Sequence, residues 1–85
     1  MSQLQLSSFA QQTAKRLRDI RERNDRMHLL EPASLAIPCK DQCRQIGVDR
    51  LDPYDKQRLL YKLADEGIEG NYSAGDTLVV TLVRR

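Results

Sequence analysis

The sequence predicts one small α+β domain with a long N-terminal helix, a short helix, a third helix and a C-terminal β-hairpin. Three observations support this. Apolar residues recur every three or four positions in the N-terminal third, an Asp-Pro pair opens another helical pattern at residue 52, and the C-terminal segment is rich in alternating β-branched residues. A chain of 85 residues has room for a single core.

Composition limits the class of protein. Charged residues make up 31% of the chain and apolar residues 40%, which is typical of a globular domain rather than a disordered one. The net charge is +2, too close to neutral to indicate a nucleic-acid partner by itself. We expect no membrane segment and no secretory signal peptide, because no apolar run is long enough for either. With only two cysteines, these features favour a cytoplasmic protein.

The first helix is expected from about Ser8 to Leu30. Ser8 and Gln11 have the spacing of a capping box, and Glu31-Pro32 should end the helix, since proline disfavours helical geometry in the residue before it. The apolar positions that define its buried stripe are Leu6, Phe9, Ala10, Thr13, Ala14, Leu17, Ile20 and Met27.

The middle of the chain allows two interpretations. In the first, Ala36 and Ile37 lead into a short helix from about Cys39 to Ile46, which Gly47 closes in the left-handed conformation. In the second, the segment from Arg44 to Leu51 is a strand, and the domain becomes a small sandwich of strand, helix and hairpin.

The third helix has clear signals at both ends. Asp52 can cap it, Pro53 fits the first helical position, and Asp55 places negative charge in the first turn. Gly67 should stop it. The apolar stripe between these ends comprises Leu59, Leu60, Leu63 and Ala64.

The C-terminal segment is predicted to be a β-hairpin. Thr77 to Val83 has strand composition, Ile68 to Tyr72 is the expected antiparallel partner, and Ser73 to Asp76 is rich in turn residues. Leu78, Val80 and Leu82 should share one buried face. We also expect the last strand to be an edge strand, open to pairing with a strand of a partner.

This order of elements carries a resemblance. The segment from Asp41 to Val48 resembles the second helix and turn of helix-turn-helix proteins, and Arg58 to Gly67 with the hairpin resembles a recognition helix that runs into a wing. Over residues 36–83 the chain therefore resembles winged helix-turn-helix DNA-binding proteins. The resemblance implies a small DNA-binding protein that regulates transcription, of the kind carried by bacteria, plasmids or phages.

The resemblance also implies which residues would face DNA. They are Tyr54, Gln57, Arg58, Tyr61 and Lys62 on the third helix, Lys40 and Arg44 on the preceding helix, and Arg84 and Arg85 at the foot of the wing. Arginine and glutamine are suited to base edges, whereas tyrosine and lysine mostly contact phosphates.

Other features count against a DNA partner. Asp49, Asp52 and Asp55 crowd the start of the third helix, where they would repel a polyanion. The basic residues of the first helix alternate with acidic ones, as on a solvated helix face. The alternative function is a non-enzymatic adaptor or inhibitor that binds a protein through the N-terminal helix or the edge strand. A homodimer formed through the long N-terminal helix is a further expectation.

Chemistry of a catalytic or metal site is not indicated. Cys39 and Cys43 lie on one side of the short helix, but no second cysteine–histidine couple exists to complete a zinc site, so we expect both in the core. The chain has one histidine and no phosphate-binding or nucleophile motif. We expect no catalytic residues, no metal and no cofactor.

Overall fold

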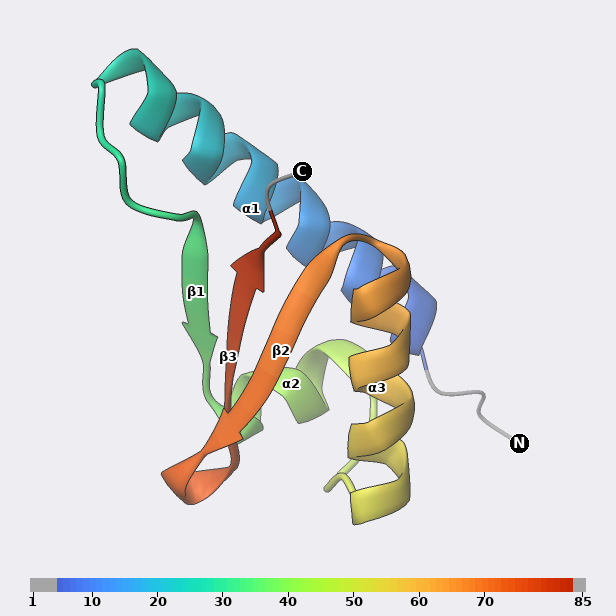
Figure 1. Ribbon diagram of the computed structural model, residues 1–85. Helices are drawn as coiled ribbons and strands as arrows, with labels where there is room; N and C mark the ends of the chain where they lie inside the picture. Colours follow the sequence, from blue (N-terminus) through green and yellow to red (C-terminus); the bar gives the residue numbers. More distant parts are fainter. Residues whose placement is uncertain (1–4, 84–85) are drawn as a thin grey trace.

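The computed structural model describes residues 5–83 and confirms the predicted fold class (Figure 1). Three helices precede a hairpin, and a short additional strand lies between the first two helices. The elements are α1 (Leu6–Arg26), β1 (Ser34–Ile37), α2 (Cys39–Ile46), α3 (Pro53–Asp65), β2 (Ile68–Ser73), the 3-10 turn η1 (Ala74–Asp76) and β3 (Thr77–Leu82).

Helix α1 exists as predicted, but both of its ends were predicted wrongly. It begins at Leu6, so Ser8 lies inside the helix and forms no capping box, and the N-cap residue Gln5 makes no side-chain hydrogen bond to the helix. It ends at Arg26 rather than near Leu30. His28 adopts a left-handed φ of 57°, and the backbone N–H of Leu29 donates to the carbonyl of Asn24 at 2.8 Å. This tight turn, and not the later proline, ends the helix.

Strand β1 was missed in the sequence, where its residues were expected only to lead into a helix. It pairs antiparallel with β3, with Ser34 opposite Thr81 and Ile37 opposite Leu78. The sheet order is therefore β1-β3-β2, and β3 is the central strand. The prediction of an edge strand at Thr77 to Val83 is wrong, because β1 covers the side of β3 that β2 leaves open.

The two interpretations of the middle segment are resolved in favour of the helix. Helix α2 spans Cys39–Ile46, and Gly47 follows with φ 87°, as a glycine after a helix can adopt without steric cost. The strand from Arg44 to Leu51 does not form, because its first residues complete α2. Helix α3 is capped as predicted, since the Asp52 carboxylate accepts a hydrogen bond from the Asp55 backbone N–H at 2.8 Å.

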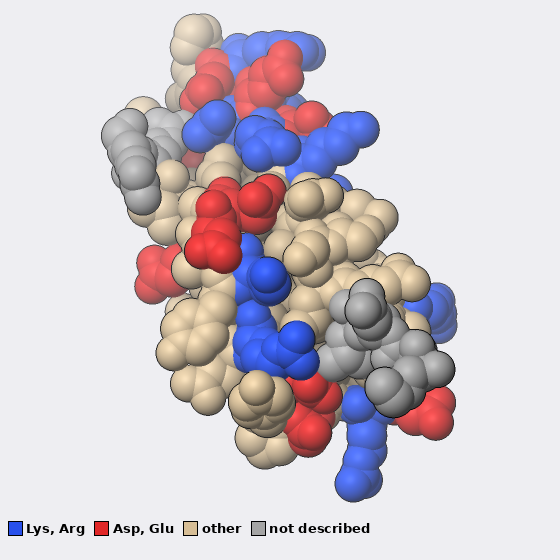
Figure 2. Space-filling view, turned by 90° about the vertical axis from the view of Figure 1, so that its right-hand side faces the viewer, with Lys and Arg blue, Asp and Glu red and all other residues tan. Residues whose placement is uncertain are grey.

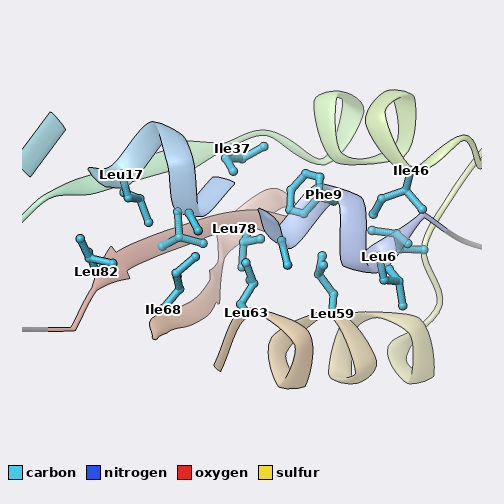
Figure 3. Close-up of a cluster of buried hydrophobic side chains, with 14 of the residues drawn as sticks. Leu6, Phe9, Leu17, Ile37, Ile46, Leu59, Leu63, Ile68, Leu78 and Leu82 are labelled. Atoms are coloured by element: carbon cyan, nitrogen blue, oxygen red, sulfur yellow. The ribbon is translucent and has the colours of Figure 1, made fainter. Parts of the chain in front are cut away.

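The core lies between the helices and one face of the sheet. Figure 3 shows side chains from all three helices and from the sheet converging, among them Phe9, Ile46, Leu63 and Leu78. Leu17, Leu59, Leu63, Leu78 and Val80 are completely buried. The C-terminal half of α1 continues past the sheet as a protruding arm (Figure 1). No helix within residues 5–83 is long and apolar enough to cross a membrane.

Candidate nucleic-acid interface

Helix α3 places five of the predicted residues on its solvent side. Leu59 and Leu63 fix the opposite side of the helix in the core, each with 0% exposure. Tyr54 is 68% exposed and Tyr61 65% exposed, which are high values for aromatic side chains. The five residues that share this exposed side are Tyr54, Gln57, Arg58, Tyr61 and Lys62. We call them the α3 face.

One contact orders part of the α3 face. The guanidinium carbon of Arg58 lies 5.7 Å from the ring centroid of Tyr54, one turn earlier on the helix. Such a cation–π contact at an exposed site stabilises by about 0.5–1 kcal/mol. It restricts the arginine side chain while leaving the N–H groups at the edge of the guanidinium plane free to donate. Arg58 is thereby partly oriented for a planar acceptor outside the chain.

The other predicted residues lie elsewhere. Lys40 and Arg44 are exposed on α2, four residues apart and therefore on one side of that helix. Arg84 and Arg85 lie outside the described residues. The last described residue, Val83, donates its backbone N–H to the Gly67 carbonyl at 2.9 Å. The described end of the hairpin is therefore beside the C-terminal end of α3, at the opposite end from the turn η1.

The charge around the α3 face is mixed. Figure 2 shows a short band of Lys and Arg over this part of the molecule, with acidic residues beyond both of its ends. Asp49 and Asp52 are exposed before α3, and Asp65 is exposed at its last turn. The α3 face therefore lacks the uniform positive potential that steers a protein to DNA from a distance. Contacts at close range would have to supply most of the affinity.

A buried glutamine joins α2 to the hairpin, although it was not among the residues predicted from the sequence. Gln42 has 0% exposure. Its side-chain N–H group donates to the Ile37 carbonyl at 2.8 Å and to the Asp76 carbonyl at 3.1 Å, and its side-chain oxygen accepts from the Tyr72 hydroxyl at 3.1 Å. One side chain thus connects β1, α2, β2 and the turn η1.

A lysine of α3 extends this connection. The Lys56 ammonium lies 2.8 Å from a carboxylate oxygen of Asp76 and 5.4 Å from the Tyr72 ring centroid. Burial is the main reason that the pKa of Tyr72 rises to about 12. We call Gln42, Lys56, Tyr72 and Asp76 the wing anchor, since together they fix η1 to both α2 and α3.

The two cysteines lie next to the wing anchor. Cys43 is buried and Cys39 is partly exposed, and their sulfur atoms are 4.0 Å apart. Burial raises the pKa of the Cys43 thiol above its ordinary value. Within residues 5–83, no group of three or more His, Cys, Asp or Glu side chains is arranged to hold a metal ion.

Comparisons with known proteins give no relative from which a role can be transferred. No protein-family model, no curated protein and no solved structure matches this chain. The function has to be argued from the site itself.

Proposed function

We propose that this protein is a small DNA-binding regulatory protein of the winged-helix type, with bacterial, plasmid or phage origin, and that α3 enters the major groove. The observation that carries the proposal is the α3 face. A helix anchored by two fully buried leucines presents glutamine, arginine, lysine and two tyrosines together to solvent. A B-DNA major groove admits one α-helix, and these are side chains suited to its bases and phosphates.

The arrangement around α3 supports this use. Helix α2 precedes α3 through a short segment that starts at Gly47, and the β2–β3 hairpin follows α3 directly. In a winged helix-turn-helix protein these elements are the turn, the recognition helix and the wing. The strand order β1-β3-β2 makes the wing part of a three-stranded sheet, so its base is rigid.

The residues of the proposed interface divide into those that would read bases and those that would contact the DNA backbone. Arg58 and Gln57 would read base edges, because arginine and glutamine can form two parallel hydrogen bonds to guanine and adenine. Tyr54, Tyr61 and Lys62 would contact the backbone. Further phosphate contacts are proposed for Lys40, Arg44, Arg84 and Arg85. Because basic residues are few, specificity would depend on α3 more than on total charge.

A salt titration of binding to duplex DNA tests the proposal. A binding site is first selected from a random duplex library, and the affinity for it and for a scrambled duplex is measured by fluorescence anisotropy. Each phosphate contact should contribute about 0.9 to the slope of log affinity against log salt, so a few contacts predict a shallow but measurable slope. If no duplex is enriched and no binding occurs at low salt, the proposal is wrong.

A second candidate function is protein binding through α1, with a second copy of the chain as the partner. Met27 is 61% exposed, Leu29 39% and Leu30 95%, so the segment directly after α1 presents apolar side chains to solvent. An adjoining hollow on α1 is lined by two acidic and two basic residues, Asp19, Glu22, Arg23 and Arg26. Two such faces packed antiparallel would place each acidic pair opposite a basic pair, as a two-fold interface requires.

Sedimentation of the protein over a range of concentrations tests this second candidate. Leu30→Ser should weaken the dimer, because it removes the most exposed leucine. Ala64→Ser at an exposed position of α3 is the matched control and should sediment like the unmodified protein. A monomer at all concentrations would exclude the homodimer. The alternative of strand addition at β3 is excluded by its central position in the sheet.

A further inference from the structure

The cysteine pair is close enough to react. Cys39 is the first residue of α2 and Cys43 lies one turn later, with their sulfur atoms 4.0 Å apart. Helix geometry places the Cα atoms of residues four apart at about 6 Å, inside the range found in disulfides. Formation of the bond would bring the sulfur atoms to about 2.05 Å and the Cβ atoms from about 5–6 Å to about 3.8 Å. The first turn of α2 must therefore tighten.

Gln42 lies within the turn that must tighten. Its side chain makes hydrogen bonds of 2.8 and 3.1 Å to Ile37 and Asp76 and accepts from Tyr72. A displacement of about 1 Å takes contacts of this length beyond hydrogen-bonding distance. Since Gln42 is completely buried, water does not readily replace the lost partners. Formation of the disulfide should therefore break hydrogen bonds of Gln42 that hold the wing anchor together.

We propose that Cys39 and Cys43 form a reversible intramolecular disulfide with small-molecule disulfides such as oxidised glutathione, and that its formation releases the turn η1 from α2. The cysteine pair is thus a modification site that controls the wing. Its effect on DNA affinity rests on the proposed function, whereas the disulfide and the release of the wing do not.

The reaction is two successive thiol–disulfide exchanges. The Cys39 thiolate attacks one sulfur of oxidised glutathione, forms a mixed disulfide and expels one glutathione thiolate. Cys43 then loses its proton to solvent and attacks the Cys39 sulfur, which expels the second glutathione thiolate. The protein loses two electrons and two protons, and one oxidised glutathione becomes two reduced molecules. Reduced glutathione in excess reverses both steps.

The two thiols differ in exposure, and this difference determines which of them reacts first. Cys39 is partly exposed and can meet a small disulfide, whereas Cys43 is 8% exposed and cannot. Burial also raises the pKa of Cys43, which favours its less reactive thiol form. Cys39 is therefore the attacking residue and Cys43 the resolving residue.

A glutathione redox titration of the full chain, without DNA, tests the proposal. Mass spectrometry should show a monomer that has lost two hydrogen atoms. Amide hydrogen exchange at residues 74–77 should then accelerate by roughly two- to tenfold, the change that follows the loss of about one hydrogen bond. Amides of Leu59 and Leu63 should stay protected, which separates release of the wing from unfolding.

Two variants serve as controls. Cys39→Ser should form no internal disulfide and should keep slow exchange at η1 under every redox condition. Gln42→Leu should show fast exchange at η1 even when fully reduced, because it removes the same hydrogen bonds without oxidation. A mixed disulfide that never resolves, or only crosslinked dimers, would overturn the assignment of the site. An internal disulfide with unchanged exchange at η1 would overturn the link to the wing.

Binding to the selected duplex is measured last. Oxidation should lower the affinity of the unmodified protein and leave that of Cys39→Ser unchanged. If the reduced protein binds no DNA, the proposed function fails, but the mass and exchange results still decide the proposed disulfide and its effect on the wing.

Discussion

The arm of α1 and the α3 face are both charged helix surfaces, but they differ in what they offer a partner. Between Lys15 and Arg26 the arm carries six basic and three acidic residues, and this range contains no aromatic side chain and no exposed amide side chain. On the arm, Glu22 neutralises Arg26 at 2.6 Å. The α3 face has only two basic residues, and within residues 5–83 no carboxylate lies in ion-pair distance of either Arg58 or Lys62.

The two surfaces therefore differ in whether they offer charge alone or also side chains that can distinguish base pairs. Phosphate contacts attract and orient a nucleic acid, but only contacts to base edges distinguish sequences. The arm is better suited to the first task and the α3 face to the second. A count of basic residues along the sequence selects the arm, whereas the type and exposure of the side chains select α3.

The largest expected effect comes from removing the support of the α3 face. Leu59→Ala should lower the free energy of unfolding by about 2–5 kcal/mol, because a completely buried leucine leaves a cavity in a tightly packed core. Leu30→Ala, in the segment after α1, should change it by less than about 0.5 kcal/mol, since Leu30 is 95% exposed. Urea denaturation of both variants measures the difference. Similar losses would show that the segment after α1 is packed in solution.

Several elements were predictable because their signals are local. The caps of α3, the glycine after α2 and the alternation of β3 involve residues a few positions apart. Strand β1 was not predictable in this way. Its four residues lie between two prolines, and its partner β3 is more than 40 residues away in the chain. The central position of β3 follows only from that distant pairing.

The residues of the candidate site also differ in whether they could be predicted from the sequence. The exposed residues of α3 followed from the helical period, because Leu59 and Leu63 fix which side is buried. The wing anchor could not be predicted, since a buried glutamine looks like a surface residue until its partners are known. One signal was present: Gln42 is three residues after Cys39 and four before Ile46, so it lies beside the apolar side of a short amphipathic helix. Arg84 and Arg85 lie outside the described residues and stay a prediction.

The second-largest expected effect is on DNA affinity, and it compares the α3 face with the arm of α1. Arg58→Ala should lower affinity for the selected site by about 1–3 kcal/mol and relax the preference at one base pair. Arg18→Ala, at an exposed position of α1, removes the same charge and should have little effect on the preference. Anisotropy titrations of both variants against the selected and scrambled duplexes provide the measurement. Equal losses on both duplexes for Arg58→Ala would assign it to a phosphate.

A pH titration examines whether Tyr72, a member of the wing anchor, is buried in solution. The pKa of Tyr72 is raised to about 12 from an ordinary value of 10.0, so the folded state holds this proton more tightly than the unfolded state. The stabilisation is therefore complete below pH 10 and is lost as the pH rises through 12. Tyr72→Phe should flatten the decline of stability across this range.

The matched control for that titration is Tyr61→Phe, because Tyr61 is 65% exposed. The stability of Tyr61→Phe should decline between pH 10 and pH 12 as much as that of the unmodified protein. The lysines contribute equally to the decline in both proteins. If both variants behave alike, the Tyr72 side chain is not buried in solution as it is in the structure.

The smallest expected effect belongs to the ion pair of the arm. Glu22 and Arg26 form a contact of 2.6 Å, but their side chains are 64% and 74% exposed. Exposed pairs of this kind contribute about 0.2–1 kcal/mol and are weakened by salt. Glu22→Gln should therefore lower stability by a few tenths of a kcal/mol at low salt and by less at high salt, measured by thermal unfolding. In a monomer this loss is independent of protein concentration. In the proposed homodimer Glu22 also faces a basic residue of the second copy, so the loss should grow with concentration. A loss that stays constant over a hundredfold range of concentration would assign the charges of the arm to the monomer alone.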